Sequence, residues 1–403
     1  MEQKFNVAVV GCGDFAQHFV PLWKNHPYVG RVYACDLVLE RSAEYSKKFD
    51  IPVIATFEDV LQREDVDAVA LFTDRHLHGP MAVKALDAGK HVYSAVPMAS
   101  SPEECKAIID AVQRNKKVYM MGETCVYYPC AMFCKREYDR GVFGKFVYGE
   151  SQYFHDISHF PERYRANRQA AALPPFYYPT HSTAMLIYAT GAHATKVTAF
   201  GYRDMEPDTP YRVGENLWDN EFSNEFSLMQ LSNGGVARVS ECRRIGYKAP
   251  SSFISGFYGT QGSYQFNNAQ HLVTELMQRG VRLRDFSHEV NPREMTEHKG
   301  MEGFKQEVAN HTFQWDSPAP IQDEEVKRLP KEFEGLPNGH MSSHQLLIDD
   351  FCKAVHDRKL PKVHAWAAAR YTIPGLIAHE SALRGGETLD IPDYGDAPED
   401  FFA

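Results

Sequence analysis

Side chains that can exchange protons and bind hydroxyl groups are concentrated in one short part of this 403-residue chain. Residues 155–181 include imidazole, carboxylate, guanidinium and phenol groups, among them those of His155, Asp156, His159, Arg163, Arg165, Tyr177, Tyr178 and His181. An imidazole titrates near neutrality and can accept or deliver a proton. Tyrosine offers an aromatic face for stacking and a hydroxyl for hydrogen bonding. The group therefore predicts a polar, aromatic pocket capable of acid–base chemistry.

His181 is the candidate general base, and Tyr178 is the candidate partner in a proton relay. The alternative for His181 is a role limited to helix capping or to hydrogen bonding of a ligand. Tyr177 is a candidate for substrate contact through its ring. A phenol, with a pKa of about 10, needs a nearby cation before it can act as a base. Core packing is the alternative for both tyrosines, because the chain contains 21 of them.

His155, Asp156 and His159 form an H-D-x-x-H pattern. On a helix this spacing could hold a metal ion if a third ligand were present. The segment begins as a strand, however, which separates the two histidines. We therefore predict no metal site, and assign His155 and Asp156 to hydrogen bonds with substrate hydroxyls. Arg165 is a further candidate for this pocket, since a guanidinium can grip a carboxylate or a pair of hydroxyls.

A second chemical signature lies near the N-terminus, where the apolar run 5–10 ends in Gly11-x-Gly13-x-x-Ala16. A strand, a tight glycine turn and a helix (expected over about 16–24) are typical of a dinucleotide-binding fold. Gly11 permits the turn, Gly13 lets the backbone approach a pyrophosphate, and the small Ala16 lets the helix pack closely. The expected cofactor contacts at this turn are Gly11, Gly13, Asp14, Phe15 and Ala16.

The next apolar run, 31–35, ends in Asp36. A carboxylate at this position binds the ribose hydroxyls of an adenosine. Because the same carboxylate repels a 2′-phosphate, the sequence predicts NAD(H) as the cofactor. Arg41 lies close enough to keep NADP(H) as the alternative.

Strand-like and helix-like segments alternate regularly up to about residue 125, which predicts a parallel sheet with helices on both faces. Beyond that point, strand-like segments of alternating polarity and a hairpin turn at 233–235 indicate an antiparallel sheet. The expected strands there are 146–154, 195–200, 225–231, 236–242, 253–258, 263–266 and 387–391, and the expected helices are 129–139, 181–190, 343–358 and 365–384. We therefore predict an α/β protein of two domains, 1–125 and 126–403.

The bulk composition narrows the class of protein. A hydrophobic content of 43% and a charged content of 24% are ordinary for a soluble globular chain. No apolar run is long enough to span a membrane, and no signal peptide is expected. The net charge of −10, without a basic tract, argues against a nucleic-acid partner. The eight cysteines show no metal-type pairing, which favours a reducing cytoplasm.

Over nearly its whole length the chain resembles the Gfo/Idh/MocA family, the glucose–fructose oxidoreductase and inositol dehydrogenase group. Besides the glycine turn, Asp36 and a helix-opening His181, the resemblance rests on Thr73-Asp-Arg-His-Leu-His78, Gly89-Lys-His-Val92, Gly141-Val-Phe-Gly144, Tyr258-Gly-Thr-Gln-Gly262 and Ala378-His-Glu-Ser381. It implies a doubly wound N-terminal Rossmann domain and a C-terminal α/β domain whose open, mainly antiparallel sheet often forms oligomer contacts. A homodimer or homotetramer is therefore expected. The resemblance also implies cofactor contacts from Thr73 and His78. Arg75 replaces the family asparagine and could reach the pyrophosphate or the substrate, and Glu123 is expected near the nicotinamide amide, with a helix N-terminal charge as its alternative.

Two catalytic positions of the family are replaced in this chain. The family follows G-K-H-V with an E-K-P motif, whose lysine helps to position substrate and assists proton transfer; here the residues are Ala95-Val96-Pro97. The aspartate that the family places four residues before the helix-opening histidine is Tyr177. The chain is therefore either a subfamily that moved its acid–base group or a protein that lost its chemistry and kept binding. The polar groups retained in residues 155–181 favour the first.

The leading hypothesis is an NAD(H)-dependent oxidoreductase acting on a secondary hydroxyl of a sugar, glycoside or cyclitol, with the hydroxyl proton passing to His181 or a tyrosine. The first alternative is a redox-neutral glycosidase, lyase or isomerase that retains its NAD. The second is a catalytically silent NAD- and ligand-binding sensor, for which Val96 is the best support. No motif separates the first two, but net formation of NADH does.

Overall fold

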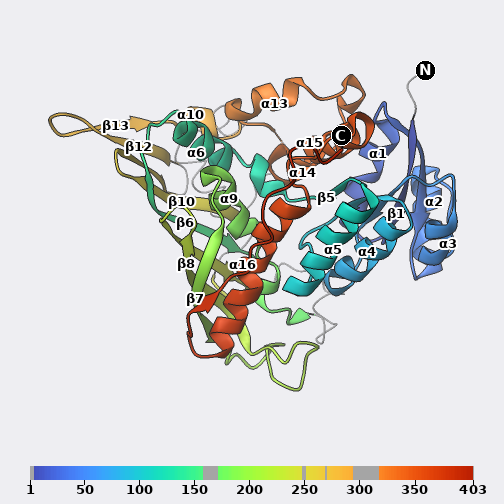
Figure 1. Ribbon diagram of the computed structural model, residues 1–403, viewed down its shortest axis with the longest axis horizontal. Coiled ribbons are helices and arrows are strands. Elements are labelled where there is room, and N and C mark those ends of the chain that lie inside the picture. Colours follow the sequence, from blue (N-terminus) through green and yellow to red (C-terminus); the bar gives the residue numbers. More distant parts are fainter. Residues whose placement is uncertain (1–3, 158–170, 247–250, 268–269, 294–316, 403) are drawn as a thin grey trace. The chain divides into compact units, whose positions relative to one another are not determined.

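The computed structural model describes residues 4–157, 171–246, 251–267, 270–293 and 317–402 (Figure 1). These residues form two compact units. The first unit contains residues 1–124, 324–369 and 394–403, and the second contains residues 125–323 and 370–393. Each unit is built around one β-sheet.

The first unit has a parallel five-stranded sheet with the order β2-β1-β3-β4-β5. Its strands are β1 (Phe5–Val10), β2 (Val29–Cys35), β3 (Ala68–Leu71), β4 (His91–Ser94) and β5 (Tyr119–Met121). The helices between them are α1 (Val20–Asn25), α2 (Leu39–Phe49), α3 (Phe57–Gln62), α4 (His78–Asp87) and α5 (Pro102–Asn115). All residues of β3, and nearly all of β1, are buried, as expected for strands covered on both faces. The predicted Rossmann sheet is confirmed.

The first unit also includes a segment from the C-terminal part of the chain. Its main helix is α15 (His344–Asp357). Phe351 of α15 lies edge-on against Phe5, Trp23 and Tyr93, with ring centroids 5.6–6.4 Å apart. The sequence predicted one domain over 126–403. In the structure, residues 324–369 and 394–403 instead group with the N-terminal residues, because the apolar face of α15 packs on the core of the Rossmann sheet.

The second unit has a nine-stranded sheet with the order β13-β12-β11-β10-β6-β9-β8-β7-β14. Its strands are β6 (Phe146–Phe154), β7 (Ala194–Arg203), β8 (Phe222–Leu231), β9 (Val236–Cys242), β10 (Ser251–Gly259), β11 (Gly262–Asn267), β12 (Gln270–Leu276), β13 (Val281–Asp285) and β14 (Leu389–Asp390). Only β6 and β9 pair in parallel, so the predicted, mainly antiparallel sheet is confirmed. The strands β12 and β13 were not predicted.

Helices cover one face of this sheet (Figure 1). They are α6 (Pro129–Asp139), α9 (Thr180–Thr190) and, from Arg370 onward, α16 (Ala365–Leu383). The other face is open over β7 and β8, where the large apolar side chains Phe200, Phe226 and Leu228 are exposed. Apolar side chains on an open sheet face are typical of a surface that binds another protein.

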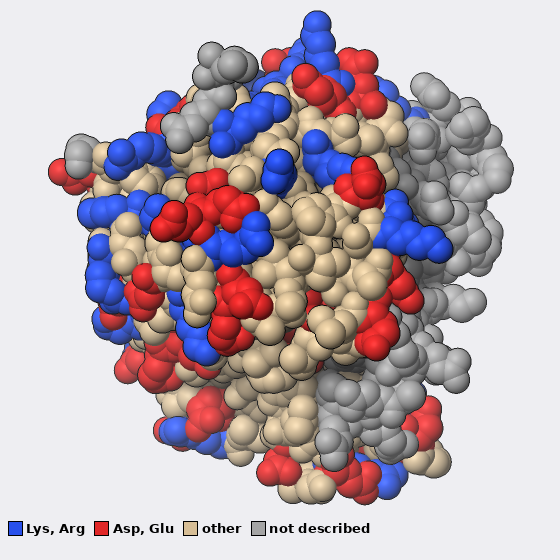
Figure 2. Space-filling view, turned by 90° about the vertical axis from the view of Figure 1, so that its right-hand side faces the viewer, with Lys and Arg blue, Asp and Glu red and all other residues tan. Residues whose placement is uncertain are grey.

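Acidic and basic side chains are interspersed on the molecular face shown in Figure 2, without a region of one sign. Within the described residues, none of the helices has the length and apolarity needed to cross a lipid bilayer.

Phe257 provides a test of the core of the second unit. Its side chain is fully buried, and its ring contacts those of Phe143 and Phe146 at centroid distances of 5.1 and 4.8 Å. We expect Phe257→Ala to lower the free energy of unfolding by about 3–5 kcal/mol, because it leaves a cavity. Denaturant unfolding measures this change. Leu383→Ala, at a position 52% exposed, is the control, with an expected change within about 0.5 kcal/mol. Equal losses for the two variants would contradict the packing.

Candidate functional site

The two glycines of the turn in the first unit, Gly11 and Gly13, have different surroundings. Gly11 has a φ of +95°, and a Cβ atom there would lie 2.5 Å from the Phe72 carbonyl oxygen. A Cβ atom at Gly13 would meet nothing within 4 Å. Gly11 is therefore required by the fold itself, whereas a Cβ atom at Gly13 would project into open space that a ligand could occupy. Beyond the turn, a short 3₁₀ segment (Ala16–His18) precedes α1, so the helix predicted from Ala16 is divided in two.

Asp36 lies at the end of β2 with its carboxylate directed back to this turn. It is 8% exposed, and its oxygens accept hydrogen bonds from the backbone N–H groups of Cys12 (2.7 Å) and Val38 (2.8 Å). Each carboxylate oxygen has two lone pairs, so ribose hydroxyls could bind at the same time. Burial, and after it the charge of Asp36, raises the pKa of Cys12 to about 12. The Cys12 thiol is therefore unreactive beside the turn.

Thr73 and His78 hold the loop that follows β3. The Thr73 hydroxyl is buried and has no hydrogen-bond partner among the described residues. His78 is 1% exposed, with Nδ1 2.8 Å from the Pro97 carbonyl oxygen and Nε2 3.1 Å from that of Thr73. Burial lowers the pKa of His78. The imidazole thus ties together the loops after β3 and β4, and the orphaned Thr73 hydroxyl is a group that a bound cofactor would satisfy.

Val96, which stands where the family has its lysine, is a buried apolar residue. Val96 is 7% exposed, in the loop that follows β4. Arg75 opens a 3₁₀ turn that precedes α4, and Glu123 follows β5 and is fully buried. Burial, and after it the Glu123 carboxylate, raises the pKa of Tyr93. Glu123 thus remains a candidate cofactor contact of the first unit, in the loop that follows β5.

Residues 340–344 also reach this turn, which sequence reasoning missed. The exposed Phe15 ring lies edge-on to His340 (5.6 Å) and His344 (5.8 Å). His340, Met341 and Ser342 have φ angles of +46°, +54° and +63°, a run of three left-handed residues none of which is glycine. Such strain persists where surrounding contacts enforce it. Residues 340–344 lie far from the glycine turn in the sequence, so no local sequence pattern could have predicted this contact.

In the second unit, His181 and Tyr178 lie in hydrogen-bonding range, as their assignment to one relay required. His181 is the second residue of α9 and is 4% exposed. Its Nε2 is 3.3 Å from the Tyr178 hydroxyl, and its Nδ1 is 3.5 Å from Sγ of Cys125. Both ring nitrogens are thus engaged, which fixes the ring orientation. A proton on the Tyr178 hydroxyl can therefore pass to or from Nε2.

A second phenol–imidazole pair lies beside the first. The Tyr153 hydroxyl is 2.7 Å from Nδ1 of His155, and the Tyr153 ring packs edge-on to His181 at 5.1 Å. The Arg243 guanidinium lies 4.9 Å from the centroid of the Tyr153 ring. Tyr153 and Arg243 were not predicted. The sequence shows only that Tyr153 is the next-to-last residue of one strand and that Arg243 directly follows another. The pairing of β6 with β9 brings the two residues together.

The remaining predicted substrate residues have different outcomes. Tyr177 is half-buried, and its ring lies edge-on to His379 at 5.0 Å. Burial, then Glu225 and Glu380, raise the pKa of Tyr177, so this phenol suits a contact better than a base. Asp156 is half-buried beyond the end of β6. Arg165, together with His159 and Arg163, lies outside the described residues.

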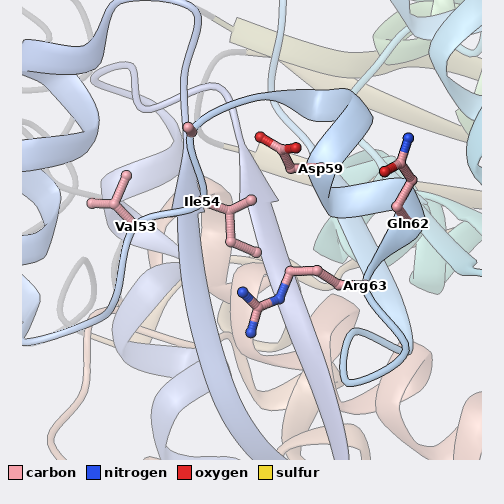
Figure 3. Close-up of a pocket in the computed structure, with 6 residues that line it drawn as sticks. Val53, Ile54, Asp59, Gln62 and Arg63 are labelled. Carbon is pink, nitrogen blue, oxygen red and sulfur yellow. The ribbon is translucent and has the colours of Figure 1, made fainter.

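A polar hollow in the first unit contains none of the predicted residues (Figure 3). It is lined by Val53, Ile54, Ala55, Asp59, Gln62 and Arg63. Arg63 at its rim donates to both carboxylate oxygens of Asp65 and lies over the Tyr33 ring. The hollow is a surface feature beside α3, separate from the glycine turn.

The two glycines of the turn make a matched test. We expect Gly11→Ala to lower the free energy of unfolding by about 2 kcal/mol or more, because of its positive φ and the clash with Phe72. Gly13→Ala should change it by less than about 0.5 kcal/mol, yet weaken NADH binding about tenfold or more by filling the open space. Thermal unfolding and fluorescence titration with NADH measure the two effects. Unchanged NADH affinity in Gly13→Ala would remove the turn from the cofactor site.

Residues 5–123 match the model of the oxidoreductase family with an NAD-binding Rossmann fold, Gfo/Idh/MocA. Two glycosyl hydrolase family 109 proteins, from Streptomyces filamentosus and Saccharopolyspora erythraea, are 23% and 22% identical over 96% of this chain and 77% and 83% of their own lengths. A protein of the same description from Shewanella baltica is 33% identical over 127 residues, or 30% of this chain and 28% of its own length.

Two solved structures share the fold over nearly the whole chain. Levoglucosan dehydrogenase in complex with NADH and levoglucosan has a TM-score of 0.72 and 19% identity, covering 97% of this chain and 100% of that one. Scyllo-inositol dehydrogenase from Lactobacillus casei, with bound NAD(H) and scyllo-inositol, has a TM-score of 0.68 and 15% identity, covering 96% and 98%. The N-terminal Rossmann domain, residues 5–123, is thus similar to the NAD-binding domain of the Gfo/Idh/MocA oxidoreductase family.

Proposed function

We propose that this protein uses NAD(H) to oxidise a secondary hydroxyl of a sugar, glycoside or cyclitol. The observation that supports this most directly is the hydrogen-bonded set Tyr178–His181–Cys125, in which both nitrogens of a buried imidazole are engaged. The dehydrogenases with the same fold bind NAD(H) together with levoglucosan or scyllo-inositol. A cluster of tyrosine and histidine side chains suits such neutral, hydroxyl-rich molecules.

The cofactor would be held by the first unit. Gly11, Gly13, Asp14, Phe15 and Ala16 form the turn that would accommodate its pyrophosphate. Asp36 would accept hydrogen bonds from the ribose and exclude a 2′-phosphate, which favours NAD over NADP. The Thr73 hydroxyl, Arg75 and Glu123 would complete this side, with His78 holding the Thr73 loop. When bound, the nicotinamide supplies the acceptor for a hydride.

The protein's own residues handle the proton. His181 Nε2 takes the proton of the substrate hydroxyl, either directly or through the Tyr178 hydroxyl at 3.3 Å. The Cys125 thiol at Nδ1 keeps the imidazole oriented. His155, Asp156, Arg165 and Tyr177 would bind the other hydroxyls of the substrate. Val96 then takes no part in proton transfer, unlike the lysine of the family motif.

A second candidate function is redox-neutral cleavage of a glycoside with NAD retained. An elimination next to an oxidised carbon needs a second group that removes a C–H proton. The Tyr153–His155 pair, with Arg243 beside it as the cation that a phenol requires, meets this need. The relatives that align over almost the whole chain are glycosyl hydrolase family 109 proteins, which supports the same candidate.

The open face of the nine-stranded sheet supports a homodimer or homotetramer, since Phe200, Phe226 and Leu228 expose 60%, 40% and 53% of their surface there. None of the eight cysteines forms a disulfide, which supports a reducing compartment such as the cytoplasm.

Gently purified protein, examined for bound NAD(H) by absorbance and fluorescence and then mixed with sugars, glycosides and inositols, tests the function. We expect one carbohydrate class to change the redox state of the nicotinamide. Net accumulation of NADH identifies a dehydrogenase, and product release without it identifies the redox-neutral enzyme. A bound cofactor that no carbohydrate reduces or oxidises would contradict both and leave a sensor.

Substitutions in the two phenol–imidazole pairs assign their roles. We expect His181→Asn to slow hydride transfer by about 10²–10⁴-fold, since it removes the general base. Tyr153→Phe should leave hydride transfer within a few-fold but abolish glycoside cleavage if the second candidate function holds. Stopped-flow measurement of nicotinamide absorbance and product analysis follow the two steps. Tyr148→Phe, whose hydroxyl contacts Glu150 in the same strand, is the matched control. Full hydride transfer in His181→Asn would refute the assignment.

A further inference from the structure

Two buried carboxylates face each other across strands β8 and β9. Glu225 and Glu241 are direct register partners, and both side chains are fully buried. Like charges placed opposite each other on antiparallel strands repel, and a buried charge is costly without partners. Each of these carboxylates must therefore be compensated by its own set of donors. The two sets connect to different segments of the candidate site.

Glu225 holds the segment that leads to Tyr178. One carboxylate oxygen accepts a hydrogen bond from the Phe176 backbone N–H at 2.7 Å, and the other lies 2.6 Å from Nδ1 of His379. The His379 ring in turn packs edge-on to Tyr177. Glu225 thus holds the 3₁₀ turn Pro175–Tyr177 in two ways: directly through the backbone of Phe176, and through His379 against the Tyr177 side chain. Tyr178 is the next residue.

Glu241 holds the start of α9, where His181 lies. Its carboxylate accepts hydrogen bonds from the Ser182 hydroxyl and from the Arg243 guanidinium, the latter at 3.1 Å. Ser182 is the neighbour of His181, and its carbonyl accepts a hydrogen bond from the Ser151 hydroxyl at 2.7 Å. The first turn of α9 is therefore attached to the sheet through a charged group.

We propose that Glu225 and Glu241 are positioning residues that together set the Tyr178–His181 hydrogen bond. One carboxylate holds the segment before Tyr178, and the other holds the turn that contains His181. Their backbones are fixed relative to each other by the β8–β9 register. The inference rests on the proposed function in one respect, that Tyr178 and His181 handle the substrate proton.

The length of the Tyr178–His181 contact makes it sensitive to this support. At 3.3 Å it is near the upper limit for a hydrogen bond, and an increase of about 0.3 Å would break it. Hydrogen bonds to a charged carboxylate are shorter and stronger than those to a neutral amide. A glutamine at position 225 offers one acceptor oxygen in place of two, so its amide nitrogen faces either the Phe176 N–H, which is a second donor, or Nδ1 of His379, whose tautomer would have to change to accept. Isosteric substitution should therefore displace the segment without a change of size.

The test uses the full-length protein with ¹⁵N-labelled histidine, and His181→Asn assigns the His181 signals. We expect Glu225→Gln and Glu241→Gln each to shift the Nε2 resonance of His181 at fixed pH. Glu137→Gln is the matched control, since Glu137 of α6 is 3% exposed and is paired with Arg136 and with Arg140, the residue that follows the helix. An unchanged Nε2 resonance in both variants, with the fold intact, would overturn the proposal. So would an equal shift in Glu137→Gln.

Two milder substitutions answer the same question should the glutamine variants fail to fold. His379→Asn and Ser182→Ala each remove one link and leave both carboxylates in place. We expect both to move the His181 Nε2 resonance in the same direction, and no movement in either would overturn the proposal.

Turnover then separates this inference from the proposed function. With a carbohydrate that reduces the bound nicotinamide, Glu225→Gln and Glu241→Gln should lower kcat about tenfold to a hundredfold with little change in KM, since a misplaced proton acceptor affects the reaction step. A loss confined to KM would contradict positioning of the relay. The resonance measurement needs no substrate, so it stands even if no carbohydrate is turned over.

Discussion

The requirement that buried polar groups be hydrogen-bonded organises the helical side of the second unit. Ser151, Glu225 and Glu241 all point from the sheet toward its helices and are almost fully excluded from water. In a water-poor environment an unmade hydrogen bond costs about 1–3 kcal/mol, and more for a charge. The segment before Tyr178 and the first turn of α9 satisfy these groups. The polar residues of the sheet therefore determine where the residues of the relay lie.

The two units use different physical means to prepare their parts of the chemistry. In the first unit the backbone dominates. The turn is shaped by a positive φ at Gly11, by open space at Gly13 and by two backbone N–H groups that donate hydrogen bonds to the Asp36 carboxylate. In the second unit the side chains dominate, in pairs such as Tyr178–His181 and Tyr153–His155. Backbone geometry suits a cofactor whose shape is constant, and side chains suit a substrate whose hydroxyl pattern must be distinguished.

This difference explains how much of the structure could be predicted from the sequence. The five-stranded sheet, the glycine turn and Asp36 depend on residues close together in the chain, and local patterns identify them. Tyr153 and Arg243 depend on the parallel pairing of β6 with β9, whose register no local pattern specifies. The return of α15 to the Rossmann core is equally non-local. The strand β13 was missed because Val281, Arg282 and Leu283 are all exposed, so no buried stripe marks it.

The loss of the family lysine at Val96 does not imply the loss of acid–base capacity. The role of a single lysine in proton transfer can be taken over by other ionisable side chains. Here two imidazoles and two phenols lie in contact, with an arginine beside one ring. Hydrogen bonds to two buried carboxylates on neighbouring strands hold the segments that carry Tyr178 and His181. Under the proposed function, an apolar residue at position 96 is compatible with catalysis, because these groups handle the substrate proton in place of a lysine.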